Sequence, residues 1–175
     1  MSRKNKFFVG VSPLGLLALS ACGGGSTSSS PTFTASTTSG FAQSGPLGNA
    51  RVFLDYDQDG VFDAGVDTEV NTLADGSFEL TTTEAGMAVA AANANGTYNI
   101  VVTVNTDSFG ASTTIDSTIG GTVSNIHFVA PSGEDNAFGG GNVMVTPATT
   151  MIHNLMALDA TLTASAAKDN VAKAL

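Results

Sequence analysis

Five aspartates stand within the thirteen residues 55–67, here called the acid loop, and their spacing is what most restricts the local fold. Residues 55–63 read DYDQDGVFD, with acids at relative positions 1, 3, 5 and 9 and glycine at position 6. Calcium takes roughly six to eight oxygen ligands, and alternating carboxylates on a loop that bends at Gly60 supply them. The pattern therefore predicts a Ca²⁺ site with these candidate ligands: the side chains of Asp55, Asp57, Asp59 and Asp63 and the carbonyl of Val61.

The far end of the acid loop departs from the pattern of EF-hand loops. Those loops end on a bidentate glutamate at position 12, where this chain has Val66. Asp67, with Glu69 beyond it, supplies the closing carboxylate if Gly65 lets the chain bulge, and Asp67 is our candidate ligand. Imperfect closure predicts an affinity of about 10⁻⁴–10⁻³ M, as in extracellular modules. The alternative is a solvated acidic turn without metal, although neighbouring carboxylates then repel one another.

Short segments rich in β-forming residues follow one another from residue 50 onward. Residues 50–55 carry an alternating pattern, and ADGSFEL at 74–80 is repeated in chemistry by ANGTYNI at 94–100. Further strands are expected at residues 113–115, 126–129 and 142–145, and residues 84–92 suit either a short helix capped by Thr83 or a strand. Six or seven short strands predict a mainly β fold, an antiparallel β-sandwich over residues 41–146.

Helical periodicity replaces the strand pattern in residues 147–175. Thr146 is a good N-cap, Pro147 takes the favoured first helical position, and an apolar stripe follows. A break at residues 161–163 precedes a second helix, which gives a C-terminal α-helical hairpin. Because the chain ends inside a helical pattern without a C-cap signal, we expect this segment to begin a truncated second domain.

The N-terminus has the three parts of a secretory signal peptide over residues 1–21. A basic segment precedes an apolar run over residues 7–19, and LSAC then ends at Cys22. This ending resembles the lipobox of bacterial lipoproteins, and the resemblance implies export, cleavage before Cys22 and its lipidation, with membrane lipid as partner. Gly23, in place of an aspartate, favours the outer membrane or cell surface. Residues 22–40 are rich in Gly, Ser and Thr and are expected to be a flexible tether.

Charge excludes some partners. The chain has six basic and fifteen acidic residues, and three of the basic ones lie in the signal segment. Without that segment three basic residues face fifteen acids, a net charge of −12. Nucleic acid is therefore not expected as a partner, whereas a divalent cation is.

Three motifs together resemble the B-repeat and carboxypeptidase-regulatory-like modules of bacterial surface proteins. They are GPLGNARVF at residues 45–53, the acid loop, and ADGSFEL at 74–80. The resemblance implies a transthyretin-like, Ig-like β-sandwich stiffened by calcium, with ligands carried over to Asp55, Asp57, Asp59 and Asp63. The family's usual glutamate falls at Val66, which leaves the last ligand open.

Catalytic motifs are missing from the sequence. Neither His127 nor His153 has a partner at ligand spacing, and no nucleophile elbow or phosphate-binding loop occurs. We therefore expect a non-catalytic, calcium-stabilised module in a surface, structural or adhesive role, whose partners include surface proteins or glycans. The alternatives are a carbohydrate- or peptide-binding lipoprotein, and the anchor and spacer of an enzyme whose catalytic domain lies beyond Leu175.

Overall fold

The computed structural model describes residues 33–93, 96–132 and 142–174. Phe33–Leu175 form one compact unit. The expected signal peptide (1–21), Cys22 and the tether up to residue 32 lie outside the described residues. No helix among the residues described is long and apolar enough to cross a membrane.

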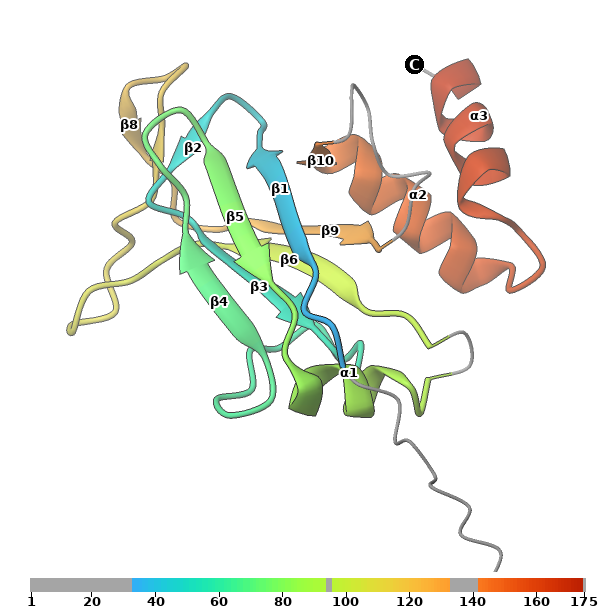
Figure 1. The fold of residues 1–175 in the computed structure, drawn as a ribbon. Coiled ribbons are helices and arrows are strands. Elements are labelled where there is room, and N and C mark those ends of the chain that lie inside the picture. The colour runs from blue at the N-terminus through green and yellow to red at the C-terminus, as the bar shows by residue number, and fades with distance from the viewer. Residues whose placement is uncertain (1–32, 94–95, 133–141, 175) are drawn as a thin grey trace, which may run out of the picture. The chain divides into compact units, whose positions relative to one another are not determined.

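The described residues are mainly β, with three sheets and three helices, as the sequence predicted in outline (Figure 1). The sheets have the strand orders β10-β1-β5, β2-β7-β8 and β4-β3-β6-β9. The strands are β1 (Thr37–Ala42), β2 (Leu47–Gly48), β3 (Arg51–Asp55), β4 (Thr68–Asn71), β5 (Ser77–Thr81), β6 (Asn99–Thr103), β7 (Ile115–Asp116), β8 (Gly121–Thr122), β9 (His127–Pro131) and β10 (Val143–Val145). The helices are α1 (Glu84–Ala90), α2 (Pro147–Leu158) and α3 (Ala164–Ala174).

Strand β3 is buried on both faces and leads directly into the acid loop. It pairs antiparallel with β4 and with β6, and the latter register places Asp55 opposite Asn99. Val52 and Leu54 point into the main core, as their alternation predicted. Phe53 points to the opposite face, where it packs with Val101 of β6 and Val129 of β9. The four-stranded sheet therefore needs a cover on each side.

The main core covers one side of this sheet. Phe78 and Leu80 of β5 and Ala42 of β1 belong to the same buried cluster as Val52 and Leu54 of β3. The sheets β10-β1-β5 and β4-β3-β6-β9 thus share one apolar interior. One face of the sheet β4-β3-β6-β9 therefore packs against the main core, and its opposite face is the one that the acid loop contacts.

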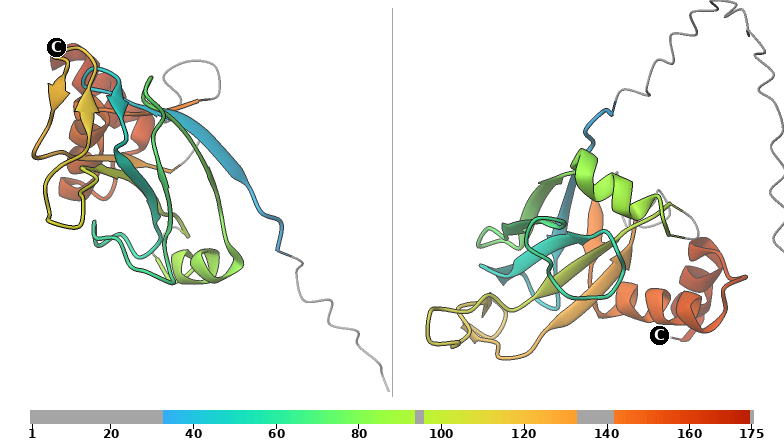
Figure 2. Two further views of the ribbon diagram at one scale, coloured as in Figure 1. Left: turned by 90° about the vertical axis from the view of Figure 1, so that its left-hand side faces the viewer. Right: turned by 90° about the horizontal axis from the view of Figure 1, so that it is seen from below.

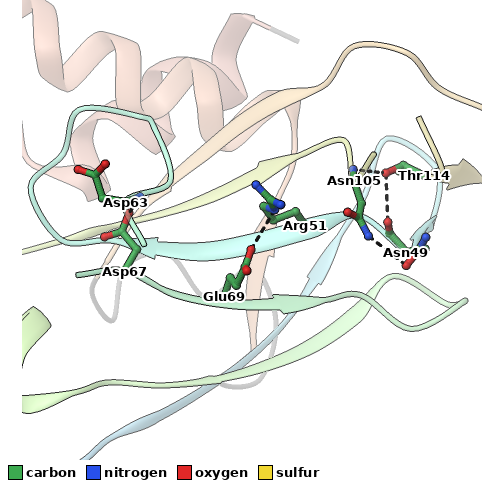
Figure 3. A network of polar contacts seen from close by, with 7 residues as sticks. All are labelled: Asn49, Arg51, Asp63, Asp67, Glu69, Asn105 and Thr114. Atoms are coloured by element: carbon green, nitrogen blue, oxygen red, sulfur yellow. Dashed lines mark hydrogen bonds and ion pairs between the residues drawn. The ribbon is translucent and has the colours of Figure 1, made fainter. Parts of the chain in front are cut away.

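The small sheet β2-β7-β8 lies beside the start of β3. Thr114 Oγ1 donates to the Asn49 carbonyl over 3.1 Å and accepts from the Asn105 amide over 2.8 Å (Figure 3). Asn49 itself has a positive φ of 54°, a conformation that asparagine tolerates better than most residues. These contacts fix the end of the sheet opposite the acid loop.

The helical hairpin packs against the strands and belongs to the same compact unit (Figures 1 and 2). The Val129 amide of β9 donates to Thr150 Oγ1 of α2 over 3.0 Å, so α2 covers the free edge of β9. Between the helices, Ile152, Ala167 and Val171 form a separate buried cluster.

Strand β1 begins inside the range expected for the tether. Thr37–Gly40 pair with β5, and Thr82 donates from its amide to the Ser36 carbonyl over 2.9 Å. Strand β1 also pairs with β10 in parallel, so the expectation of a purely antiparallel arrangement was wrong there. Both partners of β1 lie far away in the sequence, which is why its Ser- and Thr-rich composition did not indicate a strand.

Candidate metal site

Three carboxylates of the acid loop converge. Asp55, Asp57 and Asp59 each offer one oxygen, and these oxygens all lie within 4.8 Å of one another. Asp55 is the last residue of β3, so the sheet register fixes its position. The other two follow at alternate positions of the loop, which brings all three to one centre. Such a group suits a hard cation, because carboxylate oxygen is the ligand that Ca²⁺ and Mg²⁺ prefer.

The loop backbone bends as the Asp-Gly pattern requires. Gly60 has a φ of +79°, and its amide donates to Asp55 Oδ2 over 3.1 Å. The Val61 amide donates to Asp59 Oδ1 over 2.7 Å. In each of these two carboxylates, one oxygen accepts the hydrogen bond that holds the bend. Gln58 also has a positive φ, 64°, and its side chain amide donates to the Thr97 carbonyl over 2.9 Å.

Asp55 is the most informative member of the group. It is completely buried, and its Oδ1 has no hydrogen-bond partner among the described residues. The pKa of Asp55 is raised from 3.8 to about 6 in total: burial raises it most, the carboxylates of Asp57 and Asp67 raise it as well, and hydrogen bonds from the Gly60 and Gln58 amides lower it. A buried carboxylate without a partner is costly, and a bound cation removes that cost.

Asp67 closes the loop through hydrogen bonds. Its Oδ1 accepts from the Tyr56 amide over 3.2 Å. Its Oδ2 accepts from the Asp63 amide over 2.9 Å (Figure 3). Burial raises the pKa of Asp67, while these two hydrogen bonds lower it. Gly65, with a φ of +94°, permits the turn before it, as the sequence suggested. Asp67 thus lies beside the three-carboxylate group and braces it.

The carboxylates of Asp63 and Asp67 do not belong to the three-carboxylate group. The Asp63 side chain is exposed and points away from Asp67 in Figure 3. Glu69 forms an ion pair with Arg51, with 2.9 Å between Oε2 and Nε. The structure therefore groups Asp55, Asp57 and Asp59, and it leaves Glu69 occupied elsewhere.

Two aromatic residues tie the acid loop to the rest of the unit. Tyr56 is completely buried, its hydroxyl accepts from the Thr83 amide over 3.1 Å, and its carbonyl accepts from Asn93 Nδ2 over 2.8 Å. Phe62 packs edge-on against Phe53, with 5.7 Å between ring centroids.

The acid loop is the cover over the outer face of the four-stranded sheet. Phe62 packs against the buried cluster of Phe53, Val101 and Val129, and the Arg51 guanidinium lies 5.2 Å from the Phe62 ring centroid. Sequence reasoning missed this role of Phe62. An aromatic residue inside an otherwise polar loop was the available signal, since such a side chain needs an apolar surface to cover it.

The three carboxylates fit a divalent cation but do not distinguish calcium from another hard cation. Comparison of the chain with models of known protein families, with characterised proteins and with solved structures found no match. The case for a metal therefore depends on local geometry, and above all on Asp55.

Proposed function

We propose that this chain is a calcium-stabilised, non-catalytic surface module whose two packed sheets form a transthyretin-like β-sandwich. The observation that carries the proposal is the buried Asp55 Oδ1, which has no partner among the described residues and lies beside two further carboxylates. A cation there offsets both the burial of Asp55 and the mutual repulsion of the group. Asp55, Asp57 and Asp59 would hold the ion, and Asp67 would keep the loop closed around it.

The physical role of the ion is to fix the acid loop against the sheet. Phe62 covers Phe53 only while the loop stays folded back, and Tyr56 and Gln58 hold the loop's first half to α1 and Thr97. Repulsion among the carboxylates works against this closed arrangement. By removing the repulsion, calcium keeps the second apolar cluster out of water, which stiffens a module that has to withstand an extracellular environment.

Calcium uptake is tested by isothermal titration of the purified full chain. Wild type should bind about one Ca²⁺ with a dissociation constant of about 10⁻⁴–10⁻³ M, and Mg²⁺ should bind more weakly because it demands stricter octahedral geometry. Asp55→Asn should lose binding, whereas neutralisation of the exposed Asp169 should not alter it. Absence of any heat of binding in wild type would refute the proposal.

The module is also proposed to be exported and lipid-anchored through Cys22, most of all on the basis of the LSAC ending. Two or more acyl chains are needed for stable membrane attachment. In cells that receive labelled palmitate, the wild-type chain should carry label and fractionate with membranes. Cys22→Ser should do neither, while Ser26→Ala should behave as wild type. Label on the Cys22→Ser chain would contradict the anchor.

A further inference from the structure

Strands β4 and β5 start as a hairpin that opens after its first pair of residues. In the turn between them, the Leu73 amide donates to the Ser77 carbonyl over 2.8 Å, and the Gly76 amide donates to the Leu73 carbonyl over 2.9 Å. A regular antiparallel hairpin would form its next hydrogen-bonded pair between Asn71 and Glu79. The two strands do not pair there, because β4 joins the sheet β4-β3-β6-β9 and β5 joins the sheet β10-β1-β5 (Figure 1).

The edge of β4 that separates from β5 presents unpaired backbone groups. Next to β4, the Thr72 amide donates to the Ala50 carbonyl over 2.9 Å, so the backbone groups of Thr72 point toward β3. Because this direction alternates along an antiparallel strand, the N–H and C=O groups of Glu69 and Asn71 point away from β3. Among the described residues no strand pairs with this edge. An added strand therefore finds two residues of β4 ready for pairing.

A hollow of about 420 Å³, here called the wedge, lies where the two strands separate. Val70 and Asn71 of β4, Leu73 of the turn, and Phe78 and Glu79 of β5 line it. Leu73 is 67% exposed, so the wedge offers apolar surface to a partner as well as a strand edge. Successive side chains of a strand point to opposite faces of its sheet. A strand added along β4 therefore places every second side chain on the face that Val70 shares.

The charge around the wedge is negative. Glu79 lines the wedge and is exposed, and Asp75 is exposed in the turn. Arg51 lies on the neighbouring strand, but it forms an ion pair with Glu69, with 2.9 Å between Nε and Oε2. The other basic residues of the described chain lie on α3, which packs on α2. A second copy of the chain would bring the same acids to this edge, so repulsion disfavours self-pairing and the charge favours a basic partner.

We infer that the edge of β4 binds an extended, basic segment of another protein by strand addition. The backbone of the segment pairs with the outward N–H and C=O groups of Glu69 and Asn71, and these main-chain hydrogen bonds supply the attachment. An apolar side chain of the segment enters the wedge beside Val70, and a Lys or Arg side chain lies near Glu79. No residue that lines the wedge belongs to the three-carboxylate group, so the inference is separate from the calcium proposal.

The test is an NMR titration of the isotope-labelled full chain, in a zwitterionic detergent and in the presence of calcium. The probe is a peptide of about eight residues in which valine alternates with lysine. It should shift the backbone amides of Glu69 and Asn71 and slow their hydrogen exchange, with a dissociation constant below about 1 mM. The same peptide with glutamate in place of lysine should bind at least about tenfold more weakly. Equal binding of the two peptides, or shifts confined to the acid loop, would overturn the inference.

A matched pair of proline variants decides whether the edge of β4 is responsible. Asn71→Pro removes an N–H that points away from β3, a position where an edge strand tolerates proline, and should weaken peptide binding about tenfold or more. Thr122→Pro is the control on the edge strand β8. The Val123 amide donates to the Thr114 carbonyl over 3.0 Å, so the Thr122 N–H points away from β7. This control should bind the peptide as wild type does, and equal binding by Asn71→Pro would overturn the inference.

A charge variant tests the partner without touching the backbone of β4. Glu79→Lys should weaken binding of the basic peptide about threefold or more, while Asp169→Lys on α3 should leave it unchanged. An unchanged affinity of Glu79→Lys would overturn the choice of a basic partner. Shifts of the Glu69 and Asn71 amides with protein concentration alone would place a second copy on this edge and overturn it too. Calcium uptake is read in its own titration, so the two proposals fail separately.

Discussion

Calcium should raise the unfolding temperature of the chain, and neutralising two loop carboxylates should remove that rise. The perturbation is the double variant Asp57→Asn with Asp59→Asn. Asparagine keeps the oxygen that accepts from the Val61 amide at 2.7 Å and from the Asp59 amide at 3.4 Å, so the bend of the loop survives. Only the charge at the centre is lost.

The expected size of the effect follows from the site. At about 5 mM calcium, dissociation constants of about 10⁻³ M and 10⁻⁴ M stabilise the folded state by about 1 and 2 kcal/mol. At about 4 °C per kcal/mol for a unit of this length, the unfolding temperature rises by roughly 4–9 °C. The raised pKa of Asp55, about 6 against 3.8, corresponds to at most about 3 kcal/mol of penalty that a cation offsets.

Differential scanning calorimetry in calcium and in EDTA measures the rise. In EDTA the double variant should unfold at a higher temperature than wild type, because the repulsion around Asp55 is relieved, and calcium should then change it little. The control carries Glu79→Gln with Asp169→Asn, which removes the same charge from exposed positions and should respond to calcium as wild type does. The reasoning is wrong if calcium leaves the unfolding temperature of wild type unchanged, or if it raises that of the double variant as much as that of wild type.

Three further predictions concern stability without metal. In EDTA the free energy of unfolding should fall as the pH rises from about 3.8 to about 6 and then level off, because the folded state holds the Asp55 proton more tightly than the unfolded state. Urea unfolding of wild type and Asp55→Asn at several pH values tests this. The variant should lose the Asp55 contribution to the change of the unfolding free energy with pH. Phe62→Ala should cost about 1–3 kcal/mol, while Phe109→Ala, at a side chain 93% exposed, should stay within about 0.5 kcal/mol by the same assay. Gly86→Ala should destabilise by more than about 1 kcal/mol despite the better helix propensity of alanine, because a Cβ there would clash with the buried Tyr56 ring. A stabilised variant in thermal unfolding would contradict that clash.

Features with local sequence signals were predicted well. Thr146 caps α2, accepting from the Thr149 amide over 3.2 Å, and Pro147 opens the helix as its position indicated. Thr83 caps α1, which decides for a helix where a strand was the alternative. The conformation at Gly60 follows from the Asp-Gly pattern. In each case the residues that determine the structure are within four positions of one another.

Features that depend on distant partners were not predictable in the same way. Strand β1 is specified by its pairing with β5 and β10, so its Ser- and Thr-rich sequence carries no sufficient signal alone. The cover formed by Phe62 needs β3, β6 and β9 to be assembled first. The wedge between β4 and β5 arises because the two strands join different sheets, and the sequence indicated the Asp-Gly turn between them but not that separation.

Asp55 is the residue that favours the proposed metal site over a solvated acidic turn. In a solvated turn each carboxylate reaches water, and the sequence pattern alone allows that arrangement. Here the end of β3 holds Asp55 completely buried, since Asn99 stands opposite it and Gly60 donates to its Oδ2 from the returning loop. Because Asp55 is buried, its Oδ1 needs either a proton or a cation as its partner. Near pH 7 a group with a pKa of about 6 is largely ionised, and the proposed calcium would take the place of that proton while the loop stays closed.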